Sequence, residues 1–110
     1  MEVVINRCFG GFCISDEAVE LYLQKAELTY TKYNDEYYIA SNGEKYNEYS
    51  FSEDEKRTDP ILIQVVKELK EKSFGYCSKL KIVEIPDNIE FEISDYDGKE
   101  IVEEKHLKWY

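Results

Sequence analysis

Two arginines are the side chains in this sequence best suited to binding an anion. Arg7 precedes the loop Cys8-Phe9-Gly10-Gly11-Phe12, and Arg57 opens the motif Arg57-Thr58-Asp59-Pro60. A guanidinium group presents a planar fork of N–H donors that matches phosphate and carboxylate oxygens in pairs. Both arginines are therefore candidate ligand-binding residues. For Arg57 an equally good interpretation is a local salt bridge, with Glu53, Asp54 or Asp59.

The loop Phe9-Gly10-Gly11-Phe12 is a second candidate for ligand binding. Paired glycines permit backbone conformations that turn N–H groups toward an anion, and a phenylalanine beside an arginine suits stacking on a purine. No Gly-Lys-Ser/Thr and no third glycine follow at the required spacing, so the loop is neither a phosphate-binding P-loop nor a dinucleotide fingerprint. The competing interpretation is a tight turn between two core phenylalanines.

Residues that could catalyse a reaction are sparse. His106 is the single histidine and would be a general base only if Glu103 or Glu104 oriented it. The alternative is a partly exposed histidine without a catalytic role. Cys8 and Cys13 lie far from it in sequence, and a cysteine nucleophile needs a histidine within hydrogen-bond reach. We therefore expect two buried thiols and no enzyme.

The cysteines also bear on metal binding and compartment. With one histidine and no Cys-x-x-Cys pair, the usual zinc ligands are too few, and neither a metal nor a cofactor is expected. An odd number of scattered cysteines, Cys8, Cys13 and Cys77, favours a reducing compartment. The first residues do not resemble a signal peptide, and no apolar run is long enough to cross a bilayer. These features predict a cytoplasmic protein without membrane contact.

The charge balance limits the partners. The chain has 24 acidic against 14 basic residues, a formal net charge of -10. Such a field repels phosphate backbones, so direct nucleic-acid binding is not expected. The charge favours solubility, and it also suits a protein that imitates nucleic acid to occupy a basic groove.

The hydrophobic pattern predicts one folded domain, 1–110. An apolar strand, Val3–Ile5, leads into the glycine loop, and Ser15 is a good N-cap for a helix over 16–27. The tyrosine-rich segment 28–52 contains turn signals at Asn34-Asp35 and Asn42-Gly43, which predict two or three short strands.

The second half of the chain predicts a further helix and three strands. Asp59 and Pro60 suit the N-cap and first position of a helix whose apolar face contains Leu62, Val65, Val66 and Leu69. Residues 80–85 predict a buried strand, and Asp97-Gly98 predicts a hairpin turn between 91–93 and 101–102. The order βαβββαβββ indicates an α+β fold, with a mainly antiparallel sheet and two helices packed on one face.

Several of these motifs together resemble a family of small proteins encoded by phages and prophages. The motifs are Ile5-Asn6-Arg7-Cys8-Phe9-Gly10-Gly11-Phe12 with Ser15, Arg57-Thr58-Asp59-Pro60, Leu80 to Asp87, Tyr96-Asp97-Gly98 and Glu104-Lys105-His106. The characterised group most similar to this pattern is the Thoeris anti-defence proteins of the sponge type, which sequester a cyclic ADP-ribose signal without cleaving it. The resemblance spans the chain except the tyrosine-rich segment.

The resemblance implies a homo-oligomer whose ligand pockets lie at subunit interfaces and use arginine and aromatic side chains. The expected ligand-binding residues are Arg7, Phe9, Gly10, Gly11, Phe12, Arg57, Asp59, His106, Lys108 and Trp109. The family pattern has His-Arg near the C-terminus, whereas this chain has His106-Leu107-Lys108, so Lys108 is the candidate replacement for a missing arginine.

Three functional hypotheses follow. The first is a phage immune-evasion protein of the host cytoplasm that binds and sequesters a nucleotide-derived signal, cyclic ADP-ribose or a cyclic nucleotide. The second is an acidic inhibitor, of the anti-CRISPR or DNA-mimic type, that contacts a basic host defence protein which itself binds nucleic acid. The third is a hydrolase that depends on His106.

Overall fold

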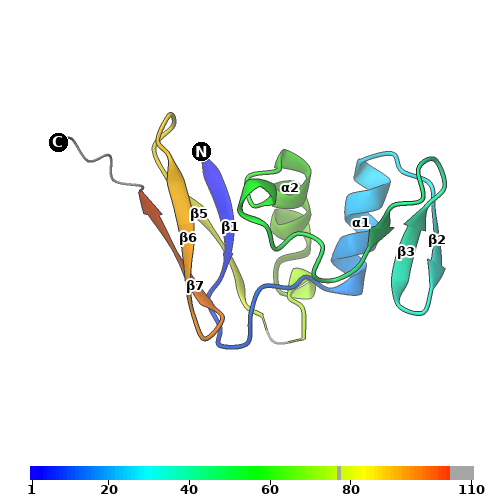
Figure 1. Ribbon diagram of the computed structural model, residues 1–110, viewed down its shortest axis with the longest axis horizontal. Coiled ribbons are helices and arrows are strands. Elements are labelled where there is room, and N and C mark those ends of the chain that lie inside the picture. The colour runs from blue at the N-terminus through cyan, green and yellow to red at the C-terminus, as the bar shows by residue number, and fades with distance from the viewer. Residues whose placement is uncertain (77, 105–110) are drawn as a thin grey trace.

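The computed structural model describes residues 1–76 and 78–104 and has an α+β fold (Figure 1). The elements are β1 (Glu2–Asn6), α1 (Asp16–Lys25), β2 (Tyr30–Tyr33), β3 (Glu36–Ile39), β4 (Lys45–Tyr46), α2 (Pro60–Leu69), β5 (Leu80–Glu84), β6 (Phe91–Tyr96) and β7 (Lys99–Glu104), with 3₁₀-helices η1 (Asp54–Lys56) and η2 (Lys70–Ser73) on either side of α2. The predicted order of helices and strands is confirmed. Three of the expected ligand-binding residues, His106, Lys108 and Trp109, lie outside the described residues.

All strand pairing among the named elements is antiparallel, as predicted, but the strands do not form one sheet. β1 pairs with β5, β2–β3–β4 form a three-stranded sheet, and β6 pairs with β7. The two helices lie between the β1–β5 pair and the β2–β4 sheet, instead of covering one face of a single sheet (Figure 1). The β1–β5 pair and the β2–β4 sheet therefore each face the helices, whereas the β6–β7 pair lies beside β1.

Local sequence signals set the helix boundaries. The Ser15 hydroxyl accepts a hydrogen bond from the Ala18 N–H at 3.1 Å, and Asp59 accepts one from the Ile61 N–H at 2.9 Å. Both predicted N-caps are thus confirmed. The first helix ends at Lys25, two residues before the expected position, because Glu27 has a positive φ of 58° that reverses the chain.

The turns also follow the sequence. Asn34 and Asp35 have φ angles of 50° and 63°, and they join β2 to β3 in the mirror-image turn that hairpins favour. Asp97 and Gly98, with φ of 50° and 90°, join β6 to β7 in the same way. The tyrosine-rich segment therefore forms a short three-stranded sheet, within the predicted range.

One hydrophobic core joins the helices to the β1–β5 pair and to the β2–β4 sheet. Val4 of β1, Leu23 of α1, Leu62 of α2 and Tyr37 of β3 are fully buried in one cluster. The predicted burial of the fifth strand is wrong beyond Leu80, because only the face with Leu80 and Ile82 packs on the core, and Lys81 and Glu84 are exposed.

Tyr22 connects the two helices. Its ring packs edge-on against Phe51 at a centroid distance of 4.5 Å, and its hydroxyl donates to Asp59 Oδ2 at 2.5 Å. Burial raises the pKa of Tyr22, and the hydrogen bond to the Asp59 carboxylate raises it further. The phenol is therefore protonated in the folded protein at a pH where an unfolded tyrosine ionises.

This raised pKa predicts a loss of stability in alkali. The contribution of Tyr22 to the free energy of unfolding should be fully present below the unfolded tyrosine pKa of about 10 and should fall as the pH rises further, since the unfolded state then binds fewer protons. Tyr22→Phe should make that fall shallower in urea unfolding measured from neutral to alkaline pH. Tyr33→Phe is the control, because Tyr33 is 65% exposed. An equal slope for Tyr22→Phe and the wild type would contradict the assignment.

Candidate functional site

Arg57 forms a buried ion pair with Glu100 of β7. The guanidinium Nη1 lies 2.7 Å from Glu100 Oε1, and Nη2 lies 2.8 Å from Oε2, which is a bidentate geometry. Arg57 is 2% exposed and Glu100 is 4% exposed. A ligand cannot reach the guanidinium without breaking this pair, so the assignment of Arg57 as a ligand contact is corrected. The alternative of a local salt bridge is also wrong, since the partner is 43 residues away.

The rest of the guanidinium is also occupied. Nε and Nη2 donate to the Ser52 carbonyl at 3.1 and 2.8 Å, and Nη1 donates to the Val4 carbonyl at 3.3 Å. The Phe12 ring lies over the group, with its centroid 3.7 Å from Arg57 Cζ. Because Phe12 is only 6% exposed, it stacks on this arginine and is not free to stack on a base, which corrects its expected role.

Asn6 organises the loops around the ion pair. Its side-chain amide donates to the Cys8 carbonyl at 2.7 Å and to the Gly98 carbonyl at 2.6 Å, while its oxygen accepts from the Cys8 and Lys79 N–H groups. Its backbone N–H donates to Glu100 Oε1 at 2.7 Å. Sequence reasoning missed this residue. A buried amide at the end of an apolar strand was the available signal, because such a group must find partners.

The glycine loop packs against the β6–β7 turn. Gly10 N donates to the Asp97 carbonyl at 3.0 Å, and a Cβ added at Gly98 would lie 2.2 Å from Gly11 N. The glycines thus permit a close approach of two backbones, in line with the tight-turn interpretation, but of its two expected core phenylalanines only Phe12 is buried. Phe9 differs from Phe12 in being 59% exposed, with Lys99 Nζ 5.5 Å from its ring centroid.

Asp59 has a structural role, and the two cysteines differ in burial. Asp59 uses one carboxylate oxygen for the α2 N-cap and the other for the Tyr22 hydroxyl, so its role is structural and not that of a ligand contact. Cys13 is buried, as expected. Cys8 is only half-buried, contrary to expectation, because it lies in the loop beyond the end of β1.

Arg7 lies in a groove between the β1–β5 pair and β7. The groove has a volume of about 310 Å³ and is lined by Ile5, Arg7, Lys81, Val83, Ile85, Ile101 and Val102. Lys81 is directly opposite Ile5 in the strand register, and Arg7 follows two residues later on the same face. The two charged residues of this lining are therefore both cations beside an aliphatic floor.

Sequence reasoning found Arg7 but missed the rest of the groove. The alternation of Lys81, Val83 and Ile85 along the chain was the available signal, since it places these residues on one face of a strand. The apolar character of 80–85 instead predicts a buried strand. The strand pairing that brings Lys81 beside Arg7 depends on a long-range register that local patterns do not define.

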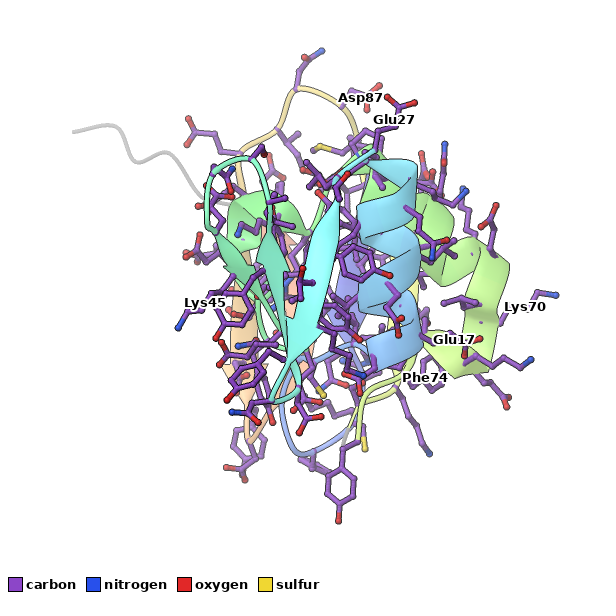
Figure 2. The ribbon with its side chains drawn as sticks, turned by 90° about the vertical axis from the view of Figure 1, so that its right-hand side faces the viewer. Glu17, Glu27, Lys45, Lys70, Phe74 and Asp87 are labelled. Atoms are coloured by element: carbon purple, nitrogen blue, oxygen red, sulfur yellow. The ribbon has the colours of Figure 1, made fainter. Side chains whose placement is uncertain are left out.

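A second cavity lies at the opposite end of the molecule. It has a volume of about 370 Å³ and is lined by Asp16, Asn34, Asp35, Glu36, Asn47, Glu48 and Tyr49. Figure 2 looks onto this end, with α1 and the β2–β3 hairpin nearest the viewer and Glu17 projecting from α1. Its charged lining residues are all acidic, in contrast to the groove beside Arg7.

Searches for a metal site, a membrane-spanning helix and related proteins add little to the choice of function. Within the described ranges, no group of three or more histidine, cysteine or acidic side chains is arranged to hold a metal ion. No helix in the described part of the chain has the length and apolar character needed to cross a membrane. Comparisons with protein-family models, curated proteins and solved structures found no match to this chain.

The ion pair predicts a large effect of a small substitution. Glu100→Gln leaves the Arg57 charge buried without its counter-charge, and it should lower the free energy of unfolding by about 3–5 kcal/mol. The matched control on the same strand is Glu103→Gln, which is exposed and should change stability by less than about 0.5 kcal/mol. Urea unfolding at neutral pH measures both. Equal stability of the two variants would show that the pair is not formed.

Proposed function

We propose that this protein binds and sequesters a nucleotide-derived defence signal, cyclic ADP-ribose or a cyclic nucleotide, without cleaving it. It would act as a phage or prophage immune-evasion protein in the host cytoplasm. The observation that supports the proposal most directly is the groove beside Arg7. On a chain of net charge -10, its lining combines two cations with aliphatic side chains.

The groove offers a fit to both parts of such a ligand. Among the described residues, the Arg7 guanidinium makes one hydrogen bond, from Nη1 to the Glu100 carbonyl at 2.7 Å, so further N–H donors remain for phosphate oxygens. Lys81 supplies a second positive charge. The side chains of Val83, Ile85 and Ile101 offer an apolar surface for a base or ribose.

The residues that line the groove favour binding of a ligand over its cleavage. Among the described residues that line the groove there is no acidic, histidine, cysteine or hydroxyl side chain. Apart from Lys81, the described lining therefore supplies no side chain of the types that usually act as general acid, general base or nucleophile. A ligand held there would be bound and released unchanged.

The proposal includes a homo-oligomer. Ile101 at the groove is 46% exposed, and an apolar rim of this kind suits closure by a second copy of the chain. Phe9 keeps its proposed role as an exposed aromatic contact. His106, Lys108 and Trp109 follow β7 in the sequence and remain proposed ligand residues.

Binding to the purified protein tests this function. Wild-type protein is titrated with cyclic ADP-ribose isomers and cyclic di- and trinucleotides, and the retained ligand is released by heating and identified by mass spectrometry. An intact nucleotide is expected. Arg7→Ala and Lys81→Ala should each weaken binding by roughly tenfold or more, because each removes a charge-assisted contact.

The control variant is Lys72→Ala, which removes an equal charge from an exposed position outside the groove lining. It should bind as the wild type does. The proposal is overturned if none of these nucleotides binds, or if Arg7→Ala binds as tightly as Lys72→Ala.

A second candidate function is supported by the acidic cavity of Asp16, Asp35, Glu36 and Glu48. An acidic surface of this kind suits a basic host defence protein that binds nucleic acid, and the chain would then be an inhibitor that acts by direct contact. Binding of this protein to the basic defence protein should weaken as the salt concentration rises, since screening reduces the electrostatic attraction. The double variant Asp35→Asn with Glu48→Gln should also weaken this binding, whereas Arg7→Ala should not.

A further inference from the structure

The β6–β7 hairpin contacts the rest of the protein without pairing with any other strand that the structure describes. It forms a two-stranded sheet of its own beside β1 (Figure 1). The hydrogen bonds between this hairpin and the rest of the described chain involve Asn6 with Glu100 and Gly98, Arg7 with Glu100, Gly10 with Asp97, Arg57 with Glu100, and Asp54 with Ile93. Glu100 takes part in four of these seven hydrogen bonds.

Glu100 connects the ion pair to the groove. Its carboxylate accepts from Arg57 and from the Asn6 N–H, while its backbone carbonyl accepts from Arg7 Nη1 at 2.7 Å. The next two residues, Ile101 and Val102, form the β7 wall of the groove. The place of β7 relative to β1 therefore fixes both the direction of the Arg7 guanidinium and the width of the groove.

We propose that the Arg57–Glu100 ion pair positions Arg7 and the β7 wall of the groove for an anionic ligand by docking the β6–β7 hairpin against β1. Arg57 and Glu100 are positioning residues and make no contact with the ligand themselves. The docking stands on the contacts above, and its effect on ligand binding rests on the function proposed for the groove.

Hydrogen exchange of the unliganded protein tests the docking directly. Arg57→Lys keeps the charge but loses the bidentate fork, so the amides of 91–104 should exchange at least about tenfold faster while those of α2 are protected as in the wild type. Equal acceleration in the hairpin and in α2 would indicate general destabilisation and would overturn the proposal. Unchanged exchange in the hairpin would overturn it as well.

A second variant leaves the ion pair intact. A Cβ at Gly98 would collide with the backbone of Gly10 and Gly11, so Gly98→Ala should push the hairpin turn away from the loop without leaving a buried charge unpaired. It should accelerate exchange in the hairpin selectively, as Arg57→Lys does. Gly43→Ala is the control, because Gly43 also has a positive φ but meets nothing within 4 Å. It should not affect the hairpin.

A double-mutant cycle then tests the link to the ligand, with cyclic ADP-ribose as the probe. Arg57→Lys should weaken its binding by roughly tenfold, as expected for a misplaced charged donor, and Arg7→Ala with Arg57→Lys should bind no more weakly than Arg7→Ala alone. Fully additive losses would show that Arg57 does not act through Arg7 and would overturn the positioning role. If the wild type does not bind cyclic ADP-ribose, the proposed function and the positioning of Arg7 for this ligand are both overturned. The hydrogen-exchange rates still decide whether the ion pair docks the hairpin.

Discussion

The ion pair between Arg57 and Glu100 is the interaction on which the rest of the structure depends. Two charges that are almost fully removed from water destabilise a fold unless every donor and acceptor has a partner. The protein meets this requirement with carbonyls from Ser52 and Val4, the Asn6 N–H and the ring of Phe12. Four segments of the chain must therefore meet at one point, which fixes how β1, the glycine loop, the segment before α2 and the hairpin are arranged.

This arrangement also determines which arginine is available to a ligand. The Glu100 carboxylate is neutralised by Arg57, and Arg7 reaches only the backbone carbonyl of the same residue. A carbonyl accepts a hydrogen bond but brings no counter-charge. The positive charge of Arg7 thus remains uncompensated by the residues that line the groove, although the two arginines lie close to one acid. Sequence reasoning named both arginines as candidate ligand contacts, with a local salt bridge as the alternative for Arg57, and the structure separates them by this difference in partner.

The helix caps and hairpin turns were predicted correctly because they depend on residues that are adjacent in the sequence. Ser15 and Asp59 each cap the helix that follows directly, and Asp97-Gly98 adopts the backbone angles of a hairpin turn. The ion pair could not be predicted in this way, because 24 acidic residues offer partners to two arginines and the correct one is 43 residues away. The division into three sheets was missed for a related reason. Antiparallel hairpins are local, but the edges at which they join are set by tertiary packing.

The carboxylates behind the net charge of -10 differ in how strongly they act on an anion in the groove. The acidic cavity lies at the end formed by α1 and the β2–β3 hairpin, whereas the groove with Arg7 lies at the β5–β7 end of a molecule 52 Å long (Figure 1). At physiological ionic strength the field of an exposed charge decays over about 8 Å. The carboxylates of the acidic cavity therefore act only weakly on a ligand in the groove. Glu84 and Glu103, exposed acids next to the lining residues Val83 and Val102 in the sequence, oppose the attraction of Arg7 and Lys81. The two proposed functions use opposite ends of the fold, so substitutions at one end leave the other intact.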